Sequence, residues 1–183
     1  LGASPQGQAG PGRTCDFVLE LRGADAISGA LTGMKRLTDC DTAHSAIFVG
    51  TEYCIVPGRG DAALFCPLIR HSHLSAMEFQ RYWLDVHAEF GRKDPQNGYC
   101  QLHPAFGQFA DTLEKFGLPR ATFDGVAEAY FADVPAMQMR LNSPAIAGDA
   151  YADEQRFIDH SRSAFVPFER IRPATPTRIP PAD

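Results

Sequence analysis

The sequence predicts an α+β fold in which a four-stranded antiparallel sheet carries helices on one face. Segments within residues 62–171 follow the order strand, helix, strand, strand, helix, strand, which is the order of a split βαβ unit. Apolar residues recur at spacings of three and four in the expected helices, whereas side chains alternate between two faces in the expected strands. A chain of 183 residues with 44% apolar and 21% charged residues fits one main globular core.

The best-defined element is a helix that begins after Ser75. Ser75 and Glu78 have the spacing of a capping box, in which two free backbone donors are satisfied. The stripe that follows has helical spacing and consists of Phe79, Tyr82, Trp83, Val86, His87 and Phe90. Gly91 and the Asp94–Pro95 pair end this helix.

The strands on either side of this helix have distinct features. The following strand covers Tyr99–His103, and alternation puts Tyr99, Gln101 and His103 on one face. The preceding strand, Ala62–Arg70, contains Pro67. Because proline cannot donate a hydrogen bond to a neighbouring strand, we expect Pro67 at a sheet edge or a bulge.

The second half of the unit begins with a long, lid-like connection over residues 104–122, which contains Phe106. The next strand, Phe123–Phe131, has an alternating pattern that places four side chains on one face: Asp124, Val126, Glu128 and Tyr130. A helix starts after Asp133 with Pro135 in its first turn. The remaining elements are a second helix that starts at Ser143–Pro144 and ends near Asp159, and a last strand over Ala164–Ile171.

The main unit, residues 59–172, is preceded and followed by other segments. Residues 1–13 are rich in Gly, Pro, Ser and Gln and predict a flexible tail. Residues 14–58 predict a β-α-β extension with its elements at Cys15–Leu21, Ala24–Leu37 and Ser45–Val56. A Gly- and Pro-rich loop at 57–61 separates this extension from the main unit. Residues 173–183 form a Pro-rich arm.

Composition excludes several classes of partner. A formal charge of −5 provides no basic surface for nucleic acid or for an anionic membrane. No apolar run approaches the roughly 20 residues that span a bilayer, and no secretory signal is visible. The five cysteines are an odd number without a CxxC spacing, which favours reduced thiols in a cytoplasmic protein.

Motifs for common cofactors are also missing. The sequence has no phosphate-binding glycine loop, dinucleotide fingerprint, serine-hydrolase elbow or c-type haem motif, so we expect no cofactor. Arg70, His71 and His73 cluster after the first strand of the main unit. An H-x-H pair without a further ligand at a fixed spacing is a weak signal, so no metal is assigned.

The motifs of residues 62–171 resemble those of the EthD-domain proteins. They are, in order, FQRYWLDVHAEFGRK, YCQLHP, FDGVAEAYFAD, SPAI, DEQRFID and FVPFER. The resemblance implies a ferredoxin-like fold of the dimeric α+β barrel superfamily, with dimerisation through the sheets. Similar proteins include accessory proteins of ether degradation and fungal dehydratases and decarboxylases of polyketide pathways. The superfamily also includes cofactor-free monooxygenases, lactone isomerases and cyclases.

Candidate site residues follow from the residue pattern and from this resemblance. His87 matches the family's helical histidine, which lines the cavity, although a histidine on an apolar helix face is also compatible with a structural hydrogen bond. We expect His87 to be the general acid/base, because histidine titrates near neutrality. The other expected catalytic residues are His103, Glu128 and Asp124, and the expected substrate contacts are Tyr99, Gln101, Trp83, Tyr130 and Phe106.

These residues predict a cofactor-independent enzyme of the lyase, dehydratase, isomerase or cyclase type. Its substrate would be a small, apolar, oxygenated compound of aromatic or polyketide-like character that enters a cavity where two histidines and two acids converge. The alternative is a non-catalytic accessory protein that holds a small molecule in the same cavity. Haem binding is a third reading that the missing haem motif disfavours. Because nothing obvious in the chain covers the second face of the sheet, we expect a homodimer.

Overall fold

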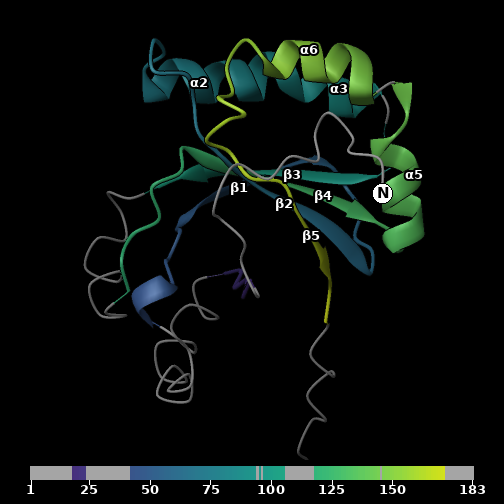
Figure 1. Ribbon diagram of the computed structural model, residues 1–183, viewed down its shortest axis with the longest axis horizontal. Helices are drawn as coiled ribbons and strands as arrows, with labels where there is room; N and C mark the ends of the chain where they lie inside the picture. Colours follow the sequence, from purple (N-terminus) through teal and green to yellow (C-terminus); the bar gives the residue numbers. More distant parts are fainter. Residues whose placement is uncertain are drawn as a thin grey trace, which may run out of the picture.

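The computed structural model describes residues 18–23, 42–93, 95, 97–105, 118–144 and 146–171. Its centre is a five-stranded antiparallel sheet with the strand order β1-β3-β4-β2-β5 (Figure 1). The strands are β1 (Gly50–Val56), β2 (Ala62–Leu68), β3 (Gly98–Pro104), β4 (Gly125–Phe131) and β5 (Val166–Glu169). The order β3-β4-β2-β5, with its crossing connections, is that of a ferredoxin-like α+β fold, so the predicted fold class is confirmed.

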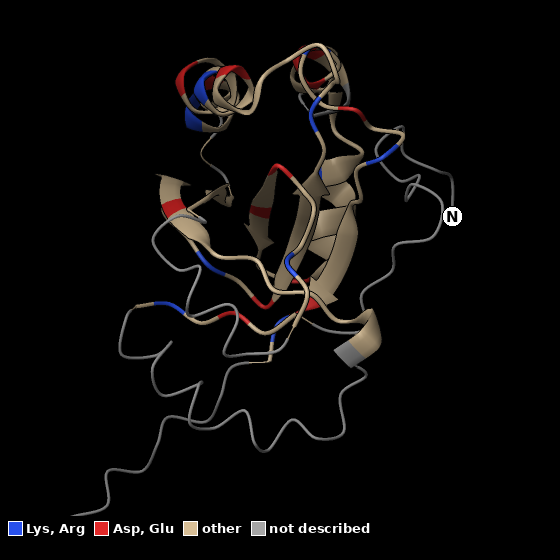
Figure 2. Ribbon diagram, turned by 90° about the vertical axis from the view of Figure 1, so that its left-hand side faces the viewer, with Lys and Arg blue, Asp and Glu red and all other residues tan. Residues whose placement is uncertain are grey.

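Two helical segments cover one face of the sheet (Figures 1 and 2). The first runs through α2 (Ala76–Tyr82), a π-helical turn η3 (Trp83–His87) and α3 (Ala88–Lys93). The second consists of a π-helical turn η4 (Ile146–Ala150) and α6 (Tyr151–Glu154). Helix α5 (Val134–Leu141) flanks the sheet, and a short 3-10 turn, η2 (Thr42–His44), precedes β1. No helix in the described ranges has the length and apolar character of a membrane span.

The predicted extension joins the main sheet instead of forming a separate unit. Its last strand is β1, which pairs with β3 from Gly50↔Pro104 onward and makes the sheet five-stranded. The strand expected over Cys15–Leu21 is wrong for residues 18–21, which have no strand pairing and leave Leu19 58% exposed. The expected helix Ala24–Leu37, the tail 1–13 and the arm 173–183 lie outside the described residues.

Pro67 lies in an inner strand, at a point beyond the end of the β2–β5 pairing, where its carbonyl oxygen accepts from Ala164 N at 3.0 Å. The β2–β5 pairing extends from Ala62↔Glu169 to Phe65↔Val166, so β5 has ended before it reaches Pro67. The neighbouring Leu68 directs its carbonyl toward β4, where Asp124 N donates to it at 2.8 Å. The backbone nitrogen of Pro67 therefore points away from β4, and no ladder donor is required there.

The core between helices and sheet is built around Phe79 and Trp83. Both side chains are almost fully buried, and they pack with Phe131, Met137 and Phe157. The start of α2 has the predicted capping box, with Glu78 N donating to Ser75 Oγ at 3.2 Å and Ser75 N donating to Glu78 Oε2 at 2.8 Å. This cap fixes where the helix begins, and thus which face turns toward the sheet.

The opposite face of the sheet is partly covered by the chain's own N-terminal segment. Arg22, from residues 18–23, donates to Glu52 Oε2 at 2.6 Å and to Glu128 Oε2 and Tyr130 Oη at 3.0 Å. The expectation that nothing in the chain covers this face is therefore wrong for the area around Glu128. Polar side chains, rather than backbone pairing, attach this segment to the sheet.

Gly125 provides a test of the contact between helix and sheet. A Cβ atom at this position would lie 2.5 Å from the Trp83 ring and 3.3 Å from the Leu102 carbonyl oxygen. We expect Gly125→Ala to lower the free energy of unfolding by about 1–3 kcal/mol, because overpacking displaces a buried ring. Denaturant titration measures this change. Gly148→Ala is the control, since a Cβ there meets nothing within 4 Å, and an equal loss in both variants would contradict the prediction.

Candidate functional site

The sheet separates the predicted site residues into two groups. His87, Trp83, Tyr99, Gln101 and His103 lie on the helix side, where their rings and hydrogen bonds meet one another. Glu128 and Tyr130 lie on the other side, with Arg22. The expected convergence of two histidines and two acids in one cavity is therefore wrong, because alternating strand residues face opposite ways. Phe106 lies outside the described residues.

A π-helical turn delivers His87 to the helix side of the sheet. Ala88 N donates to Trp83 O across this turn, five residues back instead of four. The same carbonyl accepts a second hydrogen bond from Gln101 Nε2 at 3.0 Å. Gln101, which is fully buried on β3, thus holds the turn in which His87 is the last residue. Turns of this kind are frequent at functional sites.

His87 is paired with a buried carboxylate. Its Nδ1 lies 2.8 Å from Asp153 Oδ2, and both side chains are buried. Tyr82 Oη donates to the other oxygen of Asp153 at 2.6 Å. A carboxylate can only accept, so His87 Nδ1 donates in this bond, and in a neutral ring Nε2 is then the nitrogen with the lone pair. The ring is fixed further by contacts with Phe90 and Phe157.

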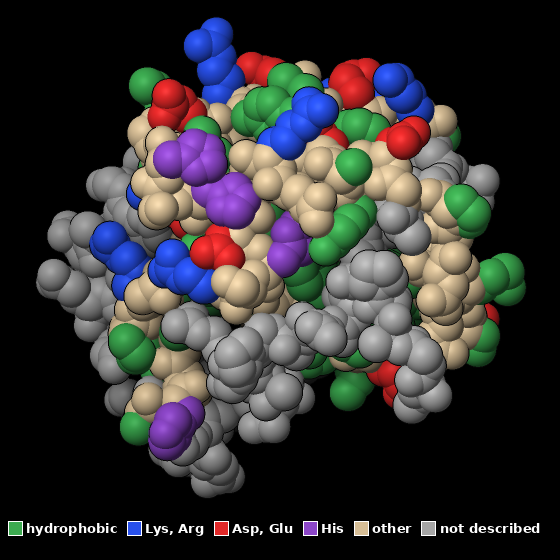
Figure 3. All heavy atoms as spheres, turned by 45° about the horizontal axis from the view of Figure 1, so that its top comes forward, with side chains coloured by type: hydrophobic (Ala, Val, Ile, Leu, Met, Phe, Trp, Pro, Cys, Tyr) green, Lys and Arg blue, Asp and Glu red, His purple; other side chains and the backbone are tan. Residues whose placement is uncertain are grey.

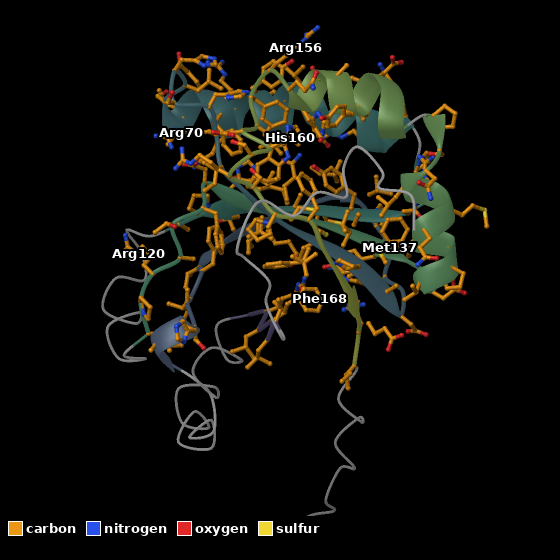
Figure 4. All side chains as sticks on the ribbon, viewed as in Figure 1. Arg70, Arg120, Met137, Arg156, His160 and Phe168 are labelled. Carbon is orange, nitrogen blue, oxygen red and sulfur yellow. The ribbon has the colours of Figure 1, made fainter. Side chains whose placement is uncertain are left out.

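Glu154 and His160 extend this group toward the surface. Glu154 Oε1 lies 3.9 Å from His87 Nε2, and Glu154 Oε2 lies 2.9 Å from His160 Nε2. His160 is positioned by the rings of Tyr151 and Phe165. In Figure 4, His160 lies between the helix layer and the sheet, whereas Arg156 lies on the outer side of that layer. Histidine side chains are also visible at the surface in Figure 3.

Sequence reasoning missed Asp153, Glu154 and His160. A usable signal was present, since Asp153 and Phe157 are four residues apart and therefore share a helix face. A carboxylate on an apolar face needs a partner for the same reason that His87 does. Asp153, and not Glu128 or Asp124, is the acid that orients His87.

The other predicted site residues on the helix side form a hydrogen-bonded network with one another. Trp83 Nε1 donates to Tyr99 Oη at 3.0 Å, and Gln101 Nε2 donates to the same oxygen at 3.1 Å. His103 Nε2 lies 3.0 Å from Gln101 Oε1, and its ring stacks on Trp83 with centroids 4.7 Å apart. Burial raises the pKa of Tyr99 and lowers the pKa of His103 to about 4, so His103 is neutral at pH 7.

Asp124, directly before the first residue of β4, has a structural role. Its two carboxylate oxygens accept hydrogen bonds from Arg70 Nη1 at 2.6 Å and from Arg70 N at 2.9 Å. Arg70 Nε also donates to Leu74 O, which ties the chain after β2 to the start of α2. The expected catalytic role of Asp124 receives no support from these contacts, because both oxygens are used to hold this connection.

The opposite face of the sheet holds a second ionisable group. Burial and, to a lesser extent, a hydrogen bond with Glu20 raise the pKa of Glu128 to about 7, against the opposing effects of Tyr130 and Arg22. Tyr130 Oη donates to Glu128, and the guanidinium of Arg59 lies 4.3 Å from the centre of the Tyr130 ring. Burial raises the pKa of Tyr130 as well. Glu128, Tyr130 and Arg22 bond to one another on this face, and the sheet separates them from His87.

An open groove of about 470 Å³ lies on the outer side of the helix layer, between α2 and the residues that follow α6. Its lining combines apolar and aromatic side chains with charged ones at the rim: Leu74, Tyr82, Val86 and Phe157, and Glu78, Arg81, Asp85 and Arg156. Tyr82 and Phe157 also contact the His87–Asp153 pair, so they separate the groove from that pair. A small apolar molecule in this groove would lie directly behind the two aromatic side chains.

The Arg70, His71 and His73 cluster has no arrangement typical of a metal site. Arg70 pairs with Asp124, His71 Nε2 lies 3.1 Å from Gln155 O, and the rings of His71 and His73 stack. Within the described ranges, no group of three or more His, Cys, Asp or Glu side chains is arranged to hold a metal ion.

Comparison with known families places this site in context. Residues 71–161 match the model of the EthD domain. Through this region the chain belongs to the EthD family. EthD domains belong to the dimeric α+β barrel superfamily, as the sequence predicted. The EthD region includes His87, Asp153, Glu154 and His160, whereas β1, β2 and β5 lie outside it. No curated protein and no solved structure matches the chain.

The depressed pKa of His103 predicts a pH dependence of stability. A histidine that titrates at about 4 when folded and at 6.5 when unfolded takes up its proton first in the unfolded chain. Its contribution to stability is therefore present above pH 6.5 and is lost as the pH falls toward 4. From pH 7.5 to pH 5 this loss is about 2 kcal/mol.

Replacing His103 with a side chain that does not titrate should remove this part of the pH dependence of stability. We expect His103→Phe and His103→Gln to show a pH 7.5-to-5 loss that is smaller than that of the wild type by about 2 kcal/mol. Their absolute stabilities should differ, because only Phe retains a ring to stack on Trp83. Urea unfolding at the two pH values measures both quantities. A wild-type pH dependence in both variants would contradict the prediction.

Proposed function

We propose that this EthD protein is a cofactor-independent acid/base enzyme that uses His87 to move a proton on a small, apolar, oxygenated compound. The observation that carries the proposal is the 2.8 Å contact between His87 Nδ1 and Asp153 Oδ2. A histidine oriented by a buried carboxylate is suited to proton transfer, because its second nitrogen is held in one position with its lone pair available. The reaction types that need only such a group are lyase, dehydratase, isomerase and cyclase chemistry.

In this proposal Asp153 and Tyr82 are positioning residues. Asp153 accepts from both His87 and Tyr82, so the imidazole cannot rotate without losing a charge-assisted hydrogen bond. When His87 takes a proton on Nε2, the adjacent Asp153 carboxylate stabilises the imidazolium that forms. The Glu154 carboxylate, 3.9 Å from Nε2, lies beyond hydrogen-bond distance and would act by stabilising the protonated ring electrostatically. Glu128 has no part in this chemistry, since it lies across the sheet.

The alternative function is a non-catalytic accessory protein that holds a small molecule. The outer groove favours it, because its apolar lining is separated from His87 by Tyr82 and Phe157. A panel of aromatic and polyketide-like compounds, screened by thermal shift and then by mass spectrometry of the incubated mixtures, distinguishes the two functions. Binding with product formation supports the enzyme, and binding without any product supports the accessory protein.

Replacing His87 tests the catalytic role directly. With a substrate from that panel, we expect His87→Gln to retain the fold and ligand binding while turnover falls by roughly 10²–10⁴-fold. The pH–rate profile should lose the limb that this histidine contributes. Asp153→Asn should lower turnover less than His87→Gln, since the imidazole remains but loses its orienting charge. The exposed His73→Gln is the matched control, and a folded His87→Gln protein with wild-type turnover would refute the proposal.

We also propose that the protein is a homodimer. Membership of EthD domains in the dimeric α+β barrel superfamily supports this proposal. Light scattering at micromolar concentration should give a mass near twice the 20.0 kDa of one chain. A mass of one chain would contradict the proposal.

A further inference from the structure

Two cysteines face each other across neighbouring strands. Cys54 of β1 is the register partner of Cys100 of β3, so both side chains lie on the sheet face away from the helices. Both thiols are free, Cys54 is exposed, and Cys100 is buried. Nothing in the proposed acid/base function uses this pair, which lies on the other side of the sheet from His87.

The hydrogen-bonding phase of the two strands shows how close the pair is. Ala105 N donates to Val49 O at 3.1 Å, so Val49 and Ala105 exchange hydrogen bonds. The next pair, Gly50↔Pro104, is consequently not hydrogen-bonded, which suits a proline that has no donor. Alternation along the ladder then makes Cys54↔Cys100 a non-hydrogen-bonded pair as well. Such pairs have Cα atoms about 4.5 Å apart, within the range that a disulfide spans.

The surroundings give the two thiols different roles. Burial raises the pKa of Cys100 to about 11, although Arg59 Nη1 donates to its Sγ at 3.3 Å and favours the thiolate. Cys54 is in contact with solvent and is the thiol that an external reagent meets first. The pair therefore combines an accessible thiol with a protected one directly opposite.

The position of β1 allows the small movement that a bond requires. β1 is the terminal strand of the sheet, and its register with β3 shifts immediately after Cys54 because of a β-bulge. A bulged edge strand can approach its neighbour without moving the inner strands. The central strands β4 and β2 need not change.

We propose that Cys54 and Cys100 form a reversible disulfide between β1 and β3 when the protein meets a hydroperoxide. In the first step, Cys54 Sγ attacks the peroxide, so that an S–O bond forms, the O–O bond breaks, and the thiol proton leaves with the departing oxygen as water or alcohol. In the second step, Cys100 Sγ attacks Cys54 Sγ. An S–S bond forms, the S–O bond breaks, and the hydroxyl leaves as water with the Cys100 proton. The two thiols lose two electrons in total, and the peroxide gains them.

The bond would join the edge strand covalently to the sheet and deprive Arg59 of one acceptor. Arg59 would keep its contacts with Glu52, at 3.3 Å, and with the Tyr130 ring. Cys54 is exposed, and exposed disulfides are among those that are reduced readily. The modification is therefore a reversible one on the face that carries Glu128.

Peptide mapping of the full chain tests the proposal. The protein is treated with hydrogen peroxide, remaining thiols are alkylated after denaturation, and the digest is analysed without reduction. We expect one linked peptide pair that contains Cys54 and Cys100, with Cys66 alkylated, and we expect dithiothreitol to separate the pair. Cys54→Ser should abolish the link and leave Cys100 alkylated, whereas Cys66→Ala should leave the link in place.

A shifted cysteine tests the facing geometry itself. In a Cys54→Ser background, Tyr53→Cys moves the thiol by one residue to the opposite face of β1, where its partner is Gln101. This variant should form no link to Cys100 at the same peroxide concentration. Overoxidation of Cys54 without a link, or a link from Cys54 to Cys15, Cys40 or a second chain, would overturn the proposal. A link of equal yield in the shifted variant would overturn it too.

Discussion

The helix layer is fastened to the sheet through Trp83, and the arrangement of the helix side depends on this contact. Its ring stacks on the His103 imidazole and lies against the backbone of Gly125. A side chain at position 125 would collide with the ring. Its indole nitrogen is bonded to Tyr99, and its carbonyl to Gln101. One residue is thus packed on two strands and hydrogen-bonded at both ends, which sets the height and rotation of the helix that carries His87.

The sheet separates two clusters of ionisable side chains, one on each of its faces. On the helix side, histidines and acids meet, with His87 beside Asp153 and His160 beside Glu154. On the other side, Arg22 links Glu20, Glu52 and Glu128. Period-two alternation alone sends neighbouring residues of β3 and β4 to these two environments. Residues that are close in sequence therefore serve separate parts of the molecule.

Much of the fold could be predicted from the sequence, because local signals there agree with tertiary packing. The capping box at Ser75 and the shared face of Tyr99, Gln101 and His103 are examples. The site was predicted less well. Alternation identified which strand residues share a face, but not which face of the sheet receives the helices. That choice depends on long-range contacts such as Trp83 with Gly125 and Arg22 with Glu128, for which local patterns carry no information.

The two π-helical turns make the site sensitive to the length of the chain as well as to its composition. Each turn contains one residue more than an α-helix would use. His87 is the last residue of the first turn, and Asp153 comes shortly after the second. Deleting a single residue from Trp83–His87 would restore ordinary α-helical pitch and rotate everything beyond it by about 100°. The aromatic residues of the helix would still be present, but the His87 imidazole would no longer lie beside the Asp153 carboxylate. Insertions and deletions in these turns are therefore under a constraint that substitution patterns alone would not reveal.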